Sequence, residues 1–154
     1  MILRYPNTLT LSVDSGTLLQ ATNSPYTDGT DTISVFKGGT GLQNNITGTN
    51  IYYAGGGGGS GYIGFSPGTG GSGGGGTGAS SAGVGTAGTD GLGGGGGGSC
   101  FAGAQANVGG DGGDGVVILR MPTANKGTFT NATETTDGSD TILTFATGSG
   151  TYNS

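Results

Sequence analysis

A stretch of 61 residues, from Gly55 to Gly115, holds 31 of the 41 glycines in the chain. It begins GGGGGSG and ends GGDGGDG, and its only charged side chains are Asp90, Asp111 and Asp114. Glycine supplies no side-chain volume, so this stretch cannot fold around a conventional hydrophobic core. Any order in it must come largely from hydrogen bonds between backbone groups.

Two structures suit such a stretch. One is a flexible tether, because Gly/Ser-rich chains behave as random coils. The other is a bundle of polyproline-II-type legs, in which the backbone forms a left-handed helix of three residues per turn and its polar groups point outward. Glycine alone lets neighbouring legs approach closely enough for these groups to pair. At ~8 residues and ~25 Å per leg, the stretch would supply roughly seven legs.

The spacing of the other residues favours the packed bundle. Apolar or small residues interrupt the glycine runs at intervals, as in YIGF at 62–65 and CFA at 100–102, whereas a tether needs only serine. Pro67, Asp90 and Asn107 stand where runs end, and these are turn-forming residue types. We therefore expect ordered legs joined by turns.

The segments on either side of this stretch repeat each other. ILRYP at 2–6 matches ILRMP at 118–122, and TDGTDTI at 27–33 matches TDGSDTI at 136–142. Their alternating apolar and β-branched residues predict strands, in the first copy at 2–5, 8–13 and 32–36, with a returning strand at 17–22. Arg4 and Arg120 occupy matching positions. We expect each to pair with a carboxylate of a turn or to pack between subunits.

The predicted fold is therefore all-β and glycine-rich, with two repeated β-blocks flanking a polyglycine-II-type bundle. We expect three units: a first β-block at 1–45, the glycine-rich module at 46–115 and a second β-block at 116–154. Met1 aligns with Val117, in the middle of the run VVIL. This alignment suggests a chain derived from a longer protein in which β-blocks and glycine-rich modules alternate.

Composition argues against several classes of function. A net charge of −5 argues against nucleic acid and against anionic membrane surfaces as partners. No apolar run reaches the ~20 residues of a membrane span, and the N-terminus lacks the pattern of a signal peptide. The chain has no His and a single Glu, and Cys100 has no His or Lys near it in sequence. GVGTAG at 83–88 fits the dinucleotide pattern GxGxxG, but no helix follows it. We expect a protein that is not an enzyme.

Asp111 and Asp114 are candidate calcium ligands. They lie in GGDGGDGV at 109–116, which matches one copy of the calcium-binding β-roll repeat GGxGxDxUx. Asp90 and backbone carbonyls would complete the shell. The alternative is that both aspartates form turns before a strand. We likewise expect Asx-turns, rather than metal sites, at Asp28 and Asp31 and at their counterparts in the second copy, Asp137 and Asp140.

Five aromatic residues are the best candidates for binding a ligand. They are the large side chains in or beside the glycine-rich stretch: Tyr52, Tyr53, Tyr62, Phe65 and Phe101. Aromatic faces stack on sugars, and nearby Asn and Ser side chains supply adaptable hydrogen bonds. The alternative is that these rings fill the space between the legs and the β-blocks.

The run YYAGGGGGSG at 52–61 and the exit GGDGVVILRMP at 112–122 resemble the glycine-rich domain of bacteriophage tail-fibre and other virion proteins. The architecture is also similar to the tail-tip adhesins of T-even-like phages, whose glycine-rich legs pack as a sandwich and whose loops meet the host receptor. The resemblance implies a virion or extracellular fibre protein. Its partners would be neighbouring virion proteins and a host-surface glycan. The small hydrophobic content suggests that the β-blocks associate with copies of themselves as a homo-oligomer, with the trimer as the common symmetry of fibres.

Two other functions stay open at this point. One is a secreted glycine-rich surface or ice-binding protein, which should carry Thr or Ala on one face at every third residue. The other is a passive glycine-rich linker between virion modules. The irregular glycine runs argue against the ice-binding alternative.

Overall fold

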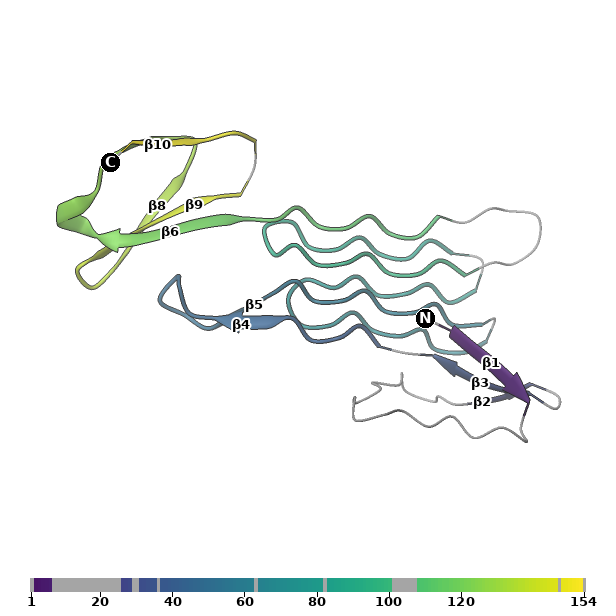
Figure 1. Ribbon diagram of the computed structural model, residues 1–154. Helices are drawn as coiled ribbons and strands as arrows, with labels where there is room; N and C mark the ends of the chain where they lie inside the picture. The colour runs from purple at the N-terminus through teal and green to yellow at the C-terminus, as the bar shows by residue number, and fades with distance from the viewer. Residues whose placement is uncertain are drawn as a thin grey trace.

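The structure is a computed structural model that describes residues 2–6, 26–28, 31–35, 37–62, 64–81, 83–100, 108–146 and 148–153. Within these residues the regular structure is β, apart from one turn of 3-10 helix, η1 (Thr123–Asn125). Figure 1 shows a long glycine-rich bundle with a block of strands at one end and three further strands near the other. The predicted fold class is confirmed.

Seven extended legs make up the bundle. We number them 1 to 7 in chain order: residues 38–41, 54–61, 67–72, 75–80, 83–89, 94–100 and 108–115. Legs 2 to 7 come from the glycine-rich stretch, and leg 1 precedes it. The sequence predicted roughly seven legs from this stretch, which is one more than the six that the structure shows there.

Hydrogen bonds between legs recur every three residues. The N–H groups of Gly58 and Gly61 in leg 2 donate to the carbonyls of Gly76 and Ala79 in leg 4, both at 2.8 Å. Leg 6 repeats the pattern toward leg 2, where Gly95 and Gly98 donate at 2.8 and 2.9 Å. A period of three belongs to the polyproline-II helix, so the legs are packed as predicted and do not form a flexible tether.

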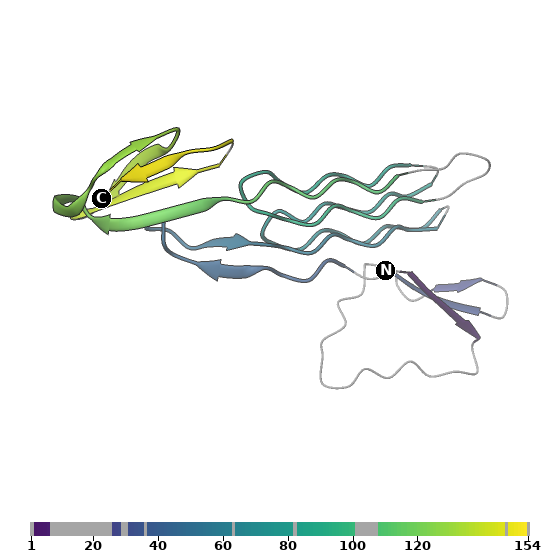
Figure 2. The same cartoon turned by 45° about the horizontal axis from the view of Figure 1, so that its top comes forward.

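The same bonds arrange the legs in two staggered layers. Legs 1, 2, 6 and 7 lie side by side in one layer, and legs 3, 4 and 5 form the other. Leg 4, in the centre, bonds to legs 2, 3, 5 and 6. Figure 2 shows the legs running alongside one another, with the loops gathered at the two ends.

Glycine is required both where the two layers meet and where legs of one layer lie side by side. A Cβ atom at Gly97 would fall on the carbonyl oxygen of Thr77, and one at Gly96 would fall on that of Gly110. These oxygens belong to backbone that is itself bonded to other legs, so they cannot move aside. Ala79 is a buried exception, with 7% of its surface exposed. The glycine content therefore has a steric cause.

Among the described residues, the largest fully buried side chains lie in the C-terminal block. Strands β6 (Val117–Pro122), β9 (Asp140–Phe145) and β8 (Thr133–Asp137) form an antiparallel sheet in that order. Strands β7 (Thr128–Thr130) and β10 (Thr151–Asn153) form a second pair. The side chains of Ile142 and Leu143 on the central strand β9 are at most 1% exposed. Hydrophobic burial therefore stabilises this part.

Strands β1 (Ile2–Pro6), β3 (Asp31–Val35) and β2 (Tyr26–Asp28) form an antiparallel sheet with the matching order. Arg4 lies opposite Ile33 as Arg120 lies opposite Ile142, and Asp28 opposite Asp31 as Asp137 opposite Asp140. The backbone register confirms the predicted repeat. The strands expected at 8–13 and 17–22 lie outside the described residues.

A hairpin between legs 1 and 2 was not predicted. Its strands, β4 (Leu42–Asn44) and β5 (Ile51–Tyr53), pair antiparallel and extend beside the C-terminal block (Figure 1). Each strand has only three residues, too few for an alternating pattern to stand out. The hairpin spans the boundary expected at 45/46.

Candidate functional site

The turn between legs 2 and 3 carries the most exposed aromatic side chain in the described part of the bundle. Tyr62 is 50% exposed, and its carbonyl accepts a hydrogen bond from the Phe65 N–H at 2.9 Å. Gly64, between them, has φ = +86°, which a side chain would disfavour. The turn therefore holds Tyr62 in solvent while Phe65 is half-buried.

A shallow hollow lies beside this turn. It has a volume of about 270 Å³ and is lined by Gly64, Phe65, Ser66, Pro67, Ser80 and Ser81. Ser81 has φ = +57°, a conformation that is uncommon for a residue with a side chain. One aromatic ring and several serines suit a polar ring such as a sugar. The hollow is slightly below the range of drug-sized ligand pockets, so it would hold one such ring.

The structure does not bring the five candidate aromatics together. Tyr52 and Tyr53 belong to strand β5, at the end of the bundle that meets the C-terminal block. Tyr62 and Phe65 lie at the opposite end, ~25 Å away along a leg of ~8 residues. Phe101 lies outside the described residues. Two separate groups therefore replace the single cluster that the sequence suggested.

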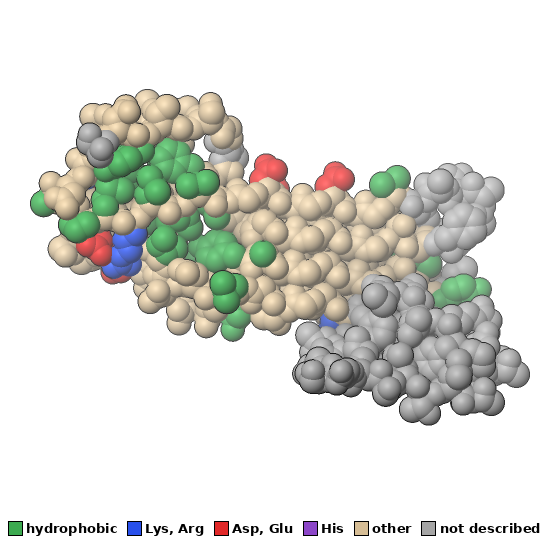
Figure 3. All heavy atoms as spheres, in the orientation of Figure 1, with side chains coloured by type: hydrophobic (Ala, Val, Ile, Leu, Met, Phe, Trp, Pro, Cys, Tyr) green, Lys and Arg blue, Asp and Glu red, His purple; other side chains and the backbone are tan. Residues whose placement is uncertain are grey.

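Tyr53 lines an apolar groove where the bundle meets the C-terminal block. The groove has a volume of about 420 Å³, and its lining residues are Leu42, Asn44, Ile46, Tyr53, Leu92, Gly115, Val116 and Ile118. Figure 3 shows hydrophobic side chains gathered at this junction. Tyr53 thus fits the alternative in which the aromatic rings fill space between legs and blocks.

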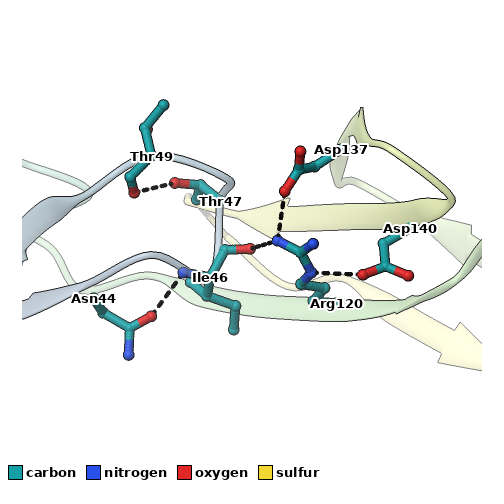
Figure 4. Close-up of polar contacts among 7 residues, drawn as sticks. All are labelled: Asn44, Ile46, Thr47, Thr49, Arg120, Asp137 and Asp140. Carbon is teal, nitrogen blue, oxygen red and sulfur yellow. Dashed lines mark hydrogen bonds and ion pairs between the residues drawn. The ribbon is translucent and has the colours of Figure 1, made fainter.

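Arg120 connects the C-terminal block to the β4–β5 hairpin. Its Nη1 lies 2.8 Å from Asp137 Oδ2, and its Nε donates to Asp140 Oδ2 at 2.8 Å (Figure 4). Nη1 also donates to the Ile46 carbonyl at the hairpin tip, at 3.3 Å. The hydrogen bonds that Arg120 donates to Asp140 and then to Asp137 raise the pKa of Arg120 above its usual value. The predicted pairing of Arg120 with turn carboxylates is confirmed.

The same contacts change the interpretation of Asp137 and Asp140. We expected Asx-turns, in which these side chains bind their own turn backbone. Their carboxylates instead bind the Arg120 guanidinium across the sheet. In the sequence, the signal for this cluster was Arg120 together with the segment TDGSD at 136–140, which matches TDGTD at 27–31. Its contact with the hairpin could not be found because the hairpin itself was not predicted.

Asp111 and Asp114 stand exposed on leg 7 and bond mainly through their backbones. The Asp111 carbonyl accepts the Gly88 N–H at 2.8 Å, and the Asp114 carbonyl accepts two N–H groups of the turn at 90–93. The Asp114 N–H donates to Asp90 Oδ1 at 2.9 Å. Three residues along a leg separate the two aspartates by ~9 Å. They tie leg 7 to the neighbouring turn, and calcium binding stays a prediction.

Residues with catalytic or metal-binding potential do not cluster in the part of the chain that the structure describes. No group of three or more His, Cys, Asp or Glu residues could hold a metal ion there. Glu134 pairs with Lys126 at 2.8 Å, and Cys100 is buried in leg 6. In the described part of the chain, no helix has the length and apolar character needed to cross a membrane.

The outer side of legs 3, 4 and 5 forms a face of small hydroxyl residues, which we call the threonine face. It consists of Ser66, Thr69, Ser72, Thr77, Ser80, Thr86 and Thr89. The bonds between legs align Thr69, Thr77 and Thr86 in one transverse row. The Thr86 hydroxyl accepts a hydrogen bond from the Thr77 N–H at 2.6 Å. It thereby satisfies a backbone donor that has no acceptor in the backbone of a neighbouring leg. The sequence contained these threonines, but only the leg register shows that they align.

The fold is a scaffold of glycine-rich legs, and the candidate binding features lie at its ends and on its surface. A family model described as a glycine-rich domain matches residues 13–122, which is more than half of the chain. The chain therefore belongs to the glycine-rich domain family. No curated protein and no solved structure matched it.

Proposed function

We propose that this protein is a non-enzymatic structural module of a bacteriophage fibre, in which the bundle acts as a stiff spacer and one end loop contacts a host-surface glycan. The two-layer lattice of legs carries the proposal. Bonds to four neighbours restrain a leg against bending, and few side chains are available for chemistry. The module would work outside the cell as part of a virion, in contact with copies of itself and with neighbouring virion proteins.

The hollow at 64–67 and 80–81 is the proposed glycan contact, with Tyr62 beside it. A panel of immobilised bacterial surface polysaccharides would test this role with the full chain. We expect Tyr62→Ala to weaken binding about tenfold, as loss of one stacking ring of ~1.4 kcal/mol would do. Tyr52→Ala, at the other end of the bundle, is the matched control and should bind normally. Equal loss in both variants, or no binding by the wild type, would contradict the proposed contact.

A secreted surface or ice-binding protein is the second candidate, and the transverse row of Thr69, Thr77 and Thr86 favours it. The irregular glycine runs concealed this regular array of small side chains. Measurement of thermal hysteresis would separate the two functions. Activity that Thr77→Leu removes would support ice binding and contradict the fibre module. A passive linker, the third alternative, should exchange all its leg amides within seconds.

A further inference from the structure

The two broad faces of the bundle differ in what covers them. The threonine face carries side chains on each of its three legs. The outer side of legs 1, 2, 6 and 7 carries glycine at the corresponding positions, and we call it the glycine face. The bonds between legs place these glycines in transverse rows: Gly39, Gly56, Gly95, Gly98, Gly109 and Gly112.

The fold of a single chain does not explain several of these glycines. A Cβ at Gly39 would meet nothing within 4 Å, and one at Gly112 would lie 3.7 Å from the nearest atom, the Gly94 oxygen. At Gly95 the nearest atom, Gly57 N, would be 3.1 Å away. None of the three has a positive φ. Alanine would therefore fit at Gly39 and Gly112, where it would lower the entropy of the unfolded chain and favour folding, whereas at Gly95 the backbone of Gly57 would have to shift by a few tenths of an ångström.

The glycine face also exposes backbone groups that lack partners. Within the described residues, the N–H and C=O groups of Gly57 and Gly96, in the two central legs of this layer, form no hydrogen bond. The equivalent outward N–H on the other face, that of Thr77, is bonded to the Thr86 hydroxyl. The glycine face thus offers donors and acceptors together, and its own outward residues, being glycines, have no side chains to cover them.

We propose that the glycine face is an interface between two copies of this chain, which pack back to back about a two-fold axis. The legs of the second copy would lie over the grooves between legs 1, 2, 6 and 7, as legs 3 to 5 do on the inner side. A surface that offers N–H and C=O groups together can satisfy itself under a two-fold rotation. Glycine at 39, 95 and 112 lets the two layers reach hydrogen-bonding distance.

The size of the face sets the expected strength. A leg of ~25 Å and four legs at ~5 Å spacing give roughly 400–500 Å² per copy, at the low end for specific complexes. The pairing should therefore be reversible and depend on concentration. It predicts a dimer, in place of the trimer expected from fibre symmetry. It does not depend on the fibre function.

Sedimentation equilibrium of the full chain, from low micromolar to near-millimolar concentration, tests the interface. We expect a monomer–dimer equilibrium that Gly112→Leu weakens at least tenfold, because the added side chain projects from the glycine face. Thr69→Leu, which adds bulk to the threonine face, is the matched control and should dimerise like the wild type. Far-ultraviolet circular dichroism checks that both variants fold.

Amide exchange supplies a second measurement that needs no variant. The N–H groups of Gly57 and Gly96 should exchange more slowly as the wild-type concentration rises, whereas the Thr77 N–H should not change. A wild type that stays monomeric throughout, or association weakened equally by Gly112→Leu and Thr69→Leu, would overturn the proposal. Exchange at Gly57 and Gly96 that is independent of concentration in a dimer would place the interface elsewhere and also overturn it.

Discussion

The bundle and the C-terminal block are stabilised in opposite ways within one chain. In the block, Ile142 and Leu143 are buried by the neighbouring strands and side chains, as in most small β domains. In the bundle, the interior consists mostly of backbone, and bonds between legs take the place of a core. At fully buried positions the block is sensitive to the loss of a methyl group, and at closely packed glycines such as Gly97 the bundle is sensitive to the gain of one. The sharpest tests are substitutions that affect only one of these two kinds of stabilisation.

Removing a core side chain from the block should have the largest effect. Leu143→Ala leaves a cavity at a fully buried site, and such changes lower the free energy of unfolding by about 2–5 kcal/mol. We expect the amides of β9 to exchange faster while those of Gly88 and Gly97 in the bundle keep their protection. Leu42→Ala, at a site that is 77% exposed, is the control and should change little. Equal loss of protection in both parts would show that they unfold as one unit.

Adding one methyl group to the bundle should come next. Gly97→Ala places a Cβ on the Thr77 carbonyl oxygen, and overpacking of this kind costs roughly 1–3 kcal/mol. We expect the upper end of that range, because backbone cannot rotate away as a side chain can. Thermal unfolding and exchange at Gly97 and Gly110 would measure the loss.

Gly112→Ala is the matched control for Gly97→Ala, since its Cβ has room. It should stabilise the isolated chain by about 0.4–1 kcal/mol. If Gly97→Ala were as stable as Gly112→Ala, the legs could not be packed as closely as the structure shows.

The contact between the two parts depends on Arg120. Arg120→Met keeps the length of the side chain but removes the bonds to Asp137, Asp140 and the Ile46 carbonyl. Because these groups are partly exposed, we expect a modest effect, seen as faster exchange of the Gly48 amide at the hairpin tip. The Gly58 and Gly97 amides in the bundle should be unaffected. Unchanged exchange at Gly48 would mean that the apolar groove alone holds the hairpin.

The smallest effect is expected on the threonine face. Thr86→Val keeps the shape of the side chain but removes the hydroxyl that accepts the Thr77 N–H. Loss of one such bond near solvent should cost about 0.5–1 kcal/mol. Thr69→Val, for which the structure gives no such bond, is the control in the same transverse row. A loss at Thr69 equal to that at Thr86 would argue against the role of the hydroxyl.

The sequence predicted the parts of the fold that local pattern encodes. Glycine content implied legs, and the repeated ILR and TDG motifs implied the matching sheets on either side. The β4–β5 hairpin was missed because three residues per strand leave no periodic signal. The split of the aromatic residues was missed for a different reason. Tyr53 and Tyr62 are close in sequence, but a fully extended leg lies between them.

The threonine face and the glycine face were harder to predict than the fold, because no local sequence pattern encodes them. Thr69, Thr77 and Thr86 are eight and nine residues apart, spacings that show no shared period. They align only because turns of different lengths set the register of legs 3, 4 and 5. Likewise, no pattern in the glycine runs distinguishes Gly97, which the interior requires, from Gly112, which it does not.

The number of legs is odd, and this parity decides where the chain leaves the bundle. Leg 1 begins near β3, each later leg reverses direction, and leg 7 leads into β6 at the far end (Figure 1). An even number would return the chain to its starting end and place the two repeated sheets side by side. Such a module could therefore gain or lose legs in pairs and still hold its two flanking sheets at opposite ends of the bundle. A single added leg would bring both flanking sheets to the same end, and the module would then no longer act as a spacer.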